Sequence, residues 1–288
     1  MSKTTAMELA LRAKQRSVRR DIGATAGWWL EGDNETPLLI LVHGFRGDHH
    51  GLSLIAASIT KYDVLIPDLP GYGKTPMLED EHNLQNYAKW LIDLVSQVNR
   101  EVVVLGHSFG SLIVATAIAE GLRVKGIILQ NPITTRASSQ KDLANRMARS
   151  FYKLTSKLGA PGSLLLASPV IVRGMSMVMA TTKKPRLRSF IHSQHSSYFS
   201  NYQQDRVAQE GFLAAISGNV LDHTEAFDLP TLLIAGEKDS IAPLVNQIKL
   251  HKQIPGSSLE IMPKVGHLTH YETPTEVASI IEKFVESL

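Results

Sequence analysis

Short apolar runs bounded by turn residues recur along the chain at the length of single strands. They predict strands at residues 38–42, 64–67, 101–105, 125–129, 231–235 and 259–262. All but the last are apolar nearly throughout, which is typical of strands that are buried on both faces of a sheet. Residues 27–31, with Trp28 and Trp29, predict an additional antiparallel edge strand.

Segments with helical spacing of apolar residues separate these runs. They predict helices at residues 52–60, 84–99, 108–120, 244–253 and 274–287. Because strands and helices alternate, we expect an α/β fold in which helices cover both faces of a mostly parallel sheet.

The alternation stops between residues 133 and 222, where Met, Leu, Ser, Arg and Lys are common and no convincing strand appears. We interpret 133–222 as a helical cap or lid over the sheet edge. Residues 23–132 and 223–288 then form the core, and 1–22 a basic N-terminal segment. The apolar stretch 163–181 is broken by Pro169, Arg173 and Gly174, so we do not expect it to span a membrane.

Charge is distributed unevenly along the 288 residues, although the net charge is only +3. Segments 1–22 and 133–222 together hold 18 Lys and Arg against 6 Asp and Glu, and the rest holds 12 against 21. Such a surface suits an anionic carrier or a membrane surface, or is simply a solvated basic face. The chain has no cysteine, which excludes disulfides and thiolate catalysis. We expect a cytoplasmic protein because the N-terminal segment has no apolar stretch of signal-peptide length.

A candidate nucleophile lies between a strand and a helix. The run at 101–105 leads into Gly106-His107-Ser108-Phe109-Gly110, which is the strand, sharp turn and helix that a G-x-S-x-G elbow requires. Glycines suit this turn because it is tight and strained. Serine is a weak nucleophile without a base, so the motif requires a histidine later in the chain.

Two later turns provide a candidate acid and base. Asp239 follows the run at 231–235, and we favour it over Glu237, which lies closer to the strand. His267 follows the run at 259–262, and we favour it over His270, which we expect to be a pocket wall or a loop brace. The chain order Ser108, Asp239, His267 is the one expected for this elbow.

The turn after residues 38–42 contains His43, Gly44 and Phe45. We expect the backbone N–H groups of Phe45 and Phe109 to form an oxyanion hole, in which each donor contributes roughly 3 kcal/mol to lowering the barrier. His43 is expected to brace the loop. At His49 and His50 we expect no metal, on the view that no carboxylate or third histidine completes a site.

Taken together, these motifs resemble the α/β-hydrolase superfamily. The Asp68-Leu69-Pro70-Gly71-Tyr72-Gly73 turn adds to the likeness, as does Glu272 with Pro274 after His267. The resemblance implies an eight-stranded, mostly parallel sheet with a cap inserted after the sixth strand, no cofactor, and a structural role for Asp68. Ser111 departs from it, because many members have a smaller residue there.

The leading hypothesis is a serine hydrolase that cleaves a carboxylic ester, with an apolar acyl or alcohol part, through an acyl-enzyme intermediate. Residues 164–179 suggest the apolar pocket, because they are rich in Leu, Ile, Val and Met. The same triad would also serve a thioesterase, a carbon–carbon bond hydrolase or a perhydrolase. A ligand receptor with little turnover is the alternative from another class. The basic segments contain no nucleic-acid recognition motif, so we expect no nucleic-acid partner.

Overall fold

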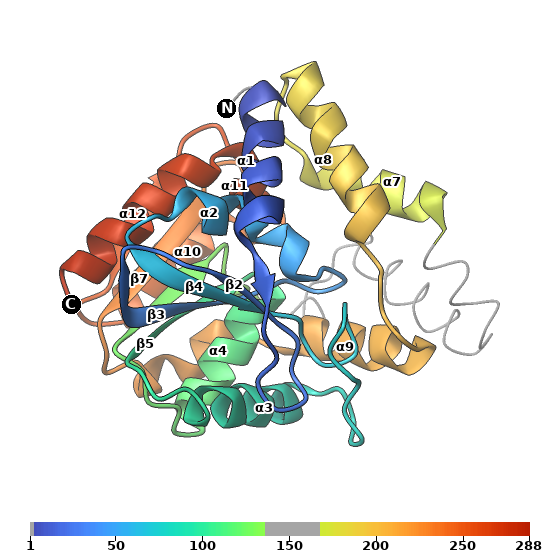
Figure 1. The fold of residues 1–288 in the computed structure, drawn as a ribbon. Helices are drawn as coiled ribbons and strands as arrows, with labels where there is room; N and C mark the ends of the chain where they lie inside the picture. The colour runs from blue at the N-terminus through green and yellow to red at the C-terminus, as the bar shows by residue number, and fades with distance from the viewer. Residues whose placement is uncertain (1–2, 136–167) are drawn as a thin grey trace.

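The computed structural model describes residues 3–135 and 168–288, which form an eight-stranded sheet flanked by helices (Figure 1). The spatial order is β1-β2-β4-β3-β5-β6-β7-β8. The strands are β1 (Val18–Arg19), β2 (Gly27–Leu30), β3 (Asn34–Val42), β4 (Tyr62–Pro67), β5 (Val102–His107), β6 (Gly126–Gln130), β7 (Thr231–Gly236) and β8 (Ser258–Met262). Every strand that the sequence predicted is present, and the expected eight-stranded, mostly parallel sheet is confirmed.

Neighbouring strands from β4 to β8 in this order are parallel, and β2 runs antiparallel to both of its neighbours, β1 and β4. The expected antiparallel strand is therefore confirmed as β2, but it does not form the edge, because β1 pairs with its outer side. The sequence analysis assigned no strand to residues 1–22, and a run of two exposed residues is too short for a pattern to reveal. Partly exposed β8 forms the opposite edge, which explains why its sequence is the least apolar.

Side chains that alternate along the strands belong to two separate hydrophobic cores, one on each face of the sheet. In β3, Leu38, Ile40 and Val42 face one layer, whereas Leu39 and Leu41 face the other. The first layer contains α3 (Leu84–Ser96), α4 (Phe109–Ala119) and α10 (Leu244–Gln253); the second contains α2 (Ser53–Ser58) and α12 (Pro274–Glu286). Because side chains alternate along a strand, each strand contributes apolar residues to both faces of the sheet. Helices cover both of these faces (Figure 1).

The described part of the chain between β6 and β7 contains α7 (Pro169–Met179), α8 (Pro185–Tyr198), α9 (Asp205–Ser217) and the 3-10 helix η3 (Val220–Ala226). It has no strand beyond one isolated bridge, between Tyr72 and Tyr202. Residues 136–167 of the expected cap lie outside the described residues, and so do 164–167 of its apolar stretch. The cap boundaries stay a prediction. No helix in the described ranges combines the length and apolarity needed to cross a membrane.

The N-terminal segment forms a helix, α1 (Lys3–Arg16), that the sequence analysis did not assign. Its side chains Ala6 and Leu9 share a buried cluster with Leu187 and Ile191 of α8 and with Tyr271 of α11 (Thr269–Glu272). In Figure 1, α1 lies between the sheet layers and α8. The two basic segments of the sequence therefore meet in space through α1 and α8.

The Asp68 carboxylate joins three segments beside the sheet. It accepts hydrogen bonds from the backbone and Nδ1 of His49 at 2.9 and 2.8 Å, from Lys74 N at 2.9 Å and from Trp28 Nε1 at 3.2 Å. Burial alone would raise the pKa of Asp68, but the bonds and charges of His49 and the charge of His43 outweigh it and lower the pKa to about 2. These contacts fit the structural role that the resemblance implied.

We expect the Asp68 carboxylate to make the free energy of unfolding depend on pH in the acidic range. Because its folded pKa is depressed, its contribution is present above about pH 4 and is lost as the pH falls toward 2, by about 2 kcal/mol. Urea unfolding followed by tryptophan fluorescence should show this extra loss in the wild type but not in Asp68→Asn. Exposed Glu35→Gln is the matched control and should behave as the wild type. Equal acid sensitivity of the wild type and Asp68→Asn would contradict this role.

Candidate active site

Ser108 lies on a strained turn between β5 and α4. Its backbone has φ 53° and ψ −115°, a conformation that a residue with a side chain rarely adopts. A Cβ on Gly106 would lie 2.4 Å from the carbonyl oxygen of Gly110, and one on Gly110 would lie 2.3 Å from that of Val42. Both glycines are therefore required by the close approach of backbone to backbone, and the turn presents Ser108 at the carboxyl end of β5.

The structure brings the three residues singled out in the sequence into one hydrogen-bonded line. His267 Nε2 lies 2.8 Å from Ser108 Oγ, and His267 Nδ1 lies 2.7 Å from Asp239 Oδ2. Since an ionised carboxylate only accepts, Nδ1 carries the proton and Nε2 is free to accept one from the serine. His267 and Asp239 are both buried, and Ser108 is half-buried.

Asp239 has all its acceptor positions occupied. Oδ1 accepts from the backbone of Ile241 and Ala242, each at 2.8 Å, and Oδ2 accepts from His267 and from Asn131 Nδ2, the latter at 2.8 Å. Burial raises the pKa of Asp239, but the His267 charge and these hydrogen bonds lower it by more, so the group is ionised at neutral pH. Glu237, the rejected alternative, instead accepts from the backbone of Lys264 at 2.6 Å, away from His267.

The loop after β3 lies directly beside the serine. A Cβ on Gly44 would be 3.5 Å from Ser108 Cβ, and the rings of Phe45 and Phe109 pack edge to face at 6.1 Å. His43 donates from Nδ1 to Gly44 O and accepts at Nε2 from Leu69 N at 3.0 Å, which is the bracing contact expected of it. The oxyanion role of the Phe45 and Phe109 amides stays a prediction.

A cavity of about 540 Å³ opens above Ser108. Helices α7, α8 and α9 contribute to its wall, and most of the lining is apolar or aromatic. The apolar lining residues include Phe45, Phe109, Met175, Val178, Met179, Phe199, Phe212, Ala215, Ile216, Ile241 and Leu268. Its volume and lining are typical of a small-molecule site. The described part of the apolar stretch 164–179 contributes three of these residues, so that segment does line the cavity.

His270 is part of this wall and is not bonded to Ser108. Its ring packs against His107 at 4.2 Å and against Tyr271 at 4.5 Å. Burial, then the charges of His107, His195 and His267, hold the pKa of His270 well below its ordinary value. The sequence analysis named His270 as a pocket wall or brace, and its position in the structure fits the first of these.

The expectation that no carboxylate stands near His49 and His50 is wrong. Asp48 precedes them in the sequence, and one ligand atom from each of the three residues lies within 4.8 Å of the others. Hydrogen bonds already engage this group, because His50 Nδ1 lies 2.9 Å from Asp48 Oδ1 and His49 Nδ1 bonds to Asp68. The His50 ring stacks on Tyr198 of α8 at 3.6 Å, so the group links the core to α8.

The sequence analysis missed a second layer of polar residues behind the triad. Asn131, directly after β6, donates to Asp239 and accepts from Thr269 Oγ1 at 2.6 Å, and Thr269 in turn accepts from Gln130 Nε2 at 2.6 Å. All three are fully buried. Asn131 has φ 47°, which asparagine tolerates better than most residues. The signal was available: a polar residue at the carboxyl end of a parallel strand next to the strand that carries Asp239.

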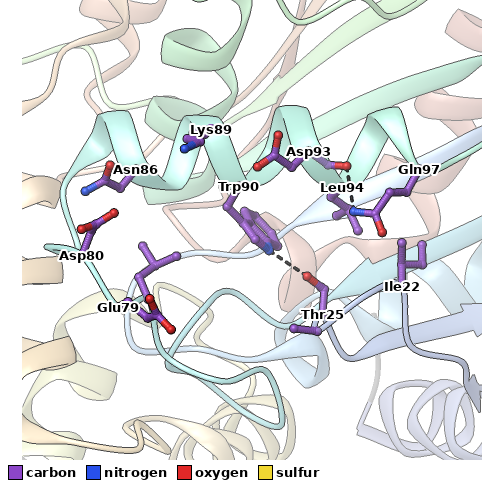
Figure 2. Close-up of a pocket in the computed structure, with 12 residues that line it drawn as sticks. Ile22, Thr25, Glu79, Asp80, Asn86, Lys89, Trp90, Asp93, Leu94 and Gln97 are labelled. Carbon is purple, nitrogen blue, oxygen red and sulfur yellow. Dashed lines mark hydrogen bonds between the residues drawn. The ribbon is translucent and has the colours of Figure 1, made fainter.

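A second hollow, between α3 and residues 22–25, has different chemistry (Figure 2). Trp90 Nε1 donates to Thr25 Oγ1 at 2.9 Å across its floor, and Glu79, Asp80 and Asp93 make its rim acidic. Its lining within the described chain includes no serine and no histidine, so it offers no serine–histidine pair like that of Ser108 and His267. The candidate active site is therefore the cavity above Ser108.

The match to a family model agrees with this fold. Residues 39–280 match the model of the alpha/beta hydrolase family, and the chain belongs to this family. A curated relative, the pimeloyl-acyl-carrier protein methyl ester esterase of Aeromonas hydrophila subsp. hydrophila, is 24% identical over 264 residues, covering 89% of this chain and 98% of the relative.

Solved structures show the same fold at lower sequence identity. An esterase from Exiguobacterium antarcticum superimposes with a TM-score of 0.73 at 18% identity, covering 91% of this chain and 96% of its own. A bromoperoxidase from Bacillus anthracis superimposes with a TM-score of 0.75 at 16% identity, covering 94% and 99%. The chain is thus a member of a hydrolase family that has esterases among its structural neighbours.

We expect Asn131 to position the Asp239 carboxylate. Asn131→Ala removes a buried hydrogen bond to a charged group, which should slow fluorophosphonate labelling of Ser108 by about tenfold or more. Asn34→Ala, which removes an exposed amide bonded only to the Lys61 carbonyl, is the control and should label at the wild-type rate. Labelling of folded Asn131→Ala at the wild-type rate would contradict the positioning role.

Proposed function

We propose that this protein is a serine hydrolase that cleaves a carboxylic ester with an apolar part through an acyl-enzyme intermediate. The carrying observation is the unbroken hydrogen-bonded line from Ser108 Oγ through His267 to Asp239. Asp239 is held ionised and directs the histidine proton to Nδ1, which leaves Nε2 facing the serine hydroxyl.

In the first half of the reaction, Ser108 Oγ forms a bond to the ester carbonyl carbon while its proton moves to His267 Nε2. The carbonyl electron pair becomes an oxyanion, which the Phe45 and Phe109 N–H groups would stabilise. The bond to the alcohol oxygen then breaks, and His267 gives that oxygen its proton. In the second half, His267 takes a proton from water, the hydroxide oxygen attacks the acyl carbon, and Ser108 leaves with the proton restored.

The other reactions open to this triad are thioester hydrolysis, carbon–carbon bond hydrolysis and perhydrolysis. We place the carboxylic ester first because it needs no group beyond those above. The receptor alternative is disfavoured, because a binding pocket does not require a nucleophile, base and acid in hydrogen-bonding contact. Turnover of an ester by the isolated protein would distinguish an enzyme from a receptor.

The cavity favours an apolar substrate part without a net charge at neutral pH. Among the described residues that line it, none is Lys or Arg, and Asp48 is the one Asp or Glu. A buried carboxylate of a substrate would lack a cationic partner there, and burying an unpaired charge is costly. We expect medium-length acyl chains to pack against the apolar wall to which α7 and α9 contribute.

The proposed mechanism predicts that Ser108→Ala loses both fluorophosphonate labelling and ester turnover, by about a thousandfold or more. Circular dichroism establishes whether the variant is folded, and Ser96→Ala, an exposed serine on α3, is the control. In a p-nitrophenyl ester series we expect medium chains to be cleaved with a higher kcat/KM than acetate. Retained turnover by Ser108→Ala would refute the mechanism, and no preference among chain lengths would refute the apolar pocket.

We further propose that an acidic acyl carrier delivers the substrate. The basic residues Lys183 and Lys184 are exposed between α7 and α8, and Arg186 is exposed at the start of α8. Both helices contribute to the cavity wall. Helix α1, which carries exposed Arg12 and Lys14, packs on α8. The curated relative described above is named for the methyl ester of a carrier-bound acyl group, which supports this partner chemistry.

Salt dependence tests the carrier. With a methyl ester attached to acyl carrier protein, we expect kcat/KM to fall steeply with ionic strength, and roughly three- to tenfold in Lys183→Glu/Arg186→Glu. With the same ester free in solution, neither change should matter. Lys249→Glu, an exposed lysine on α10, is the control. Equal salt response for both substrates would contradict a carrier, and salt-sensitive binding to anionic vesicles in its place would point to a membrane surface.

A further inference from the structure

The cavity wall includes two histidines that the proposed mechanism does not use. His270 and His195 both line the cavity, yet neither bonds to Ser108. They come from different parts of the chain, His270 from α11 and His195 from α8, and each packs on Tyr271. Both side chains are at least nine-tenths buried. Two imidazoles in a mostly apolar lining require a physical reason, because burying a polar group without a partner costs free energy.

The ring nitrogens of His270 have no partner among the described residues. Nδ1 is enclosed and makes no hydrogen bond. Nε2 also makes none but is not enclosed, so it is the nitrogen that borders the cavity. His195 differs in that its Nδ1 lies 2.7 Å from Ser176 Oγ, which also lies 2.6 Å from His192 Nδ1. Ser176 thereby holds the His195 ring in place, whereas packing alone holds His270.

The tautomer of His270 follows from this asymmetry. An enclosed N–H without an acceptor is less tolerable than an enclosed lone pair, so the proton belongs on Nε2. Burial and the neighbouring imidazoles lower the pKa of His270 far below neutrality, and burial with the charge of His192 lowers the pKa of His195 to about 4. Both rings are neutral at pH 7, and His270 Nε2–H is a hydrogen-bond donor directed at the cavity.

We propose that His270, with His195 beside it, forms a binding subsite for an uncharged oxygen of the substrate, a hydroxyl or keto group separate from the ester being cleaved. This inference rests on the proposed ester hydrolysis and narrows its substrate class to oxygen-bearing esters. A neutral donor suits an uncharged oxygen, because a carboxylate buried here would lack a cation among the described lining residues.

A purely structural role accounts poorly for His270. A phenylalanine would keep the ring contacts to His107 and Tyr271 without leaving Nδ1 unsatisfied. Replacing an unpaired buried polar group by an apolar group of similar shape is neutral or stabilising. His270 therefore makes the folded protein less stable than phenylalanine would at this position. Such a loss of stability is typical of a residue that binds a ligand.

The test compares matched esters with and without one extra oxygen. We use p-nitrophenyl butyrate against p-nitrophenyl 3-hydroxybutyrate for the acyl side, and butyl acetate against 3-hydroxybutyl acetate for the alcohol side. The wild type should prefer the hydroxylated member of one pair, mainly through KM. His270→Phe should lower roughly tenfold the ratio of kcat/KM for the hydroxylated ester to kcat/KM for the plain ester. His270→Gln, which keeps a donor, should restore part of it.

Thermal unfolding supplies a second readout, since His270→Phe should unfold at the same temperature as the wild type or higher. His251→Phe, on α10 outside the cavity lining, is the control and should leave both preferences unchanged. Plain-ester turnover with no hydroxyl preference in the wild type, or a preference that His270→Phe leaves intact, overturns the subsite alone. Absence of all ester turnover and fluorophosphonate labelling in the wild type overturns the proposed function and the subsite with it.

Discussion

The close packing of backbone on backbone around Ser108 is the constraint on which the site depends. Residues 106 and 110 must be glycine, because a Cβ at either would lie within 2.4 Å of a carbonyl oxygen of a neighbouring segment. That packing holds Ser108 in a conformation that its own side chain disfavours, at φ 53°. The strained turn places the hydroxyl above the sheet edge, where the loops after β3, β6 and β7 also converge.

Near this turn, the cost of burying ionisable side chains is met in two different ways. The carboxylates of Asp68 and Asp239 are buried but surrounded by donors, so both have lowered pKa values and are charged at neutral pH. The imidazoles of His107 and His270 are buried without an acidic partner, and burial lowers both pKa values, that of His107 to about 3. The protein interior thus separates fixed charges, which orient the triad, from neutral polar groups, which are available to a substrate.

The cavity is formed by segments that lie far apart in the sequence. Its floor comes from β3, β5 and β8 turns, and its wall from α7, α8 and α9, which the chain inserts between β6 and β7. Helix α1 packs against α8, and the same cluster includes Leu268 and Tyr271 next to His267. The position of the wall is therefore tied to the N-terminus and to the catalytic turn through one apolar cluster. In the proposed function the reacting groups lie in the core and the inserted helices contact the substrate, as is common when one fold serves many substrates.

The sequence by itself determined the sheet, its covering helices and the order in which Ser108, Asp239 and His267 follow their strands. Periodicity and turn chemistry are local, and the carboxyl ends of parallel strands must share one edge, so these residues converge in any such fold. Only the tertiary structure decided that Asn131 supports Asp239, that α1 packs on α8, and that His270 borders the cavity with an unpaired ring. Those contacts join segments tens to more than a hundred residues apart, and side-chain packing, which leaves no periodic trace in the sequence, selects them.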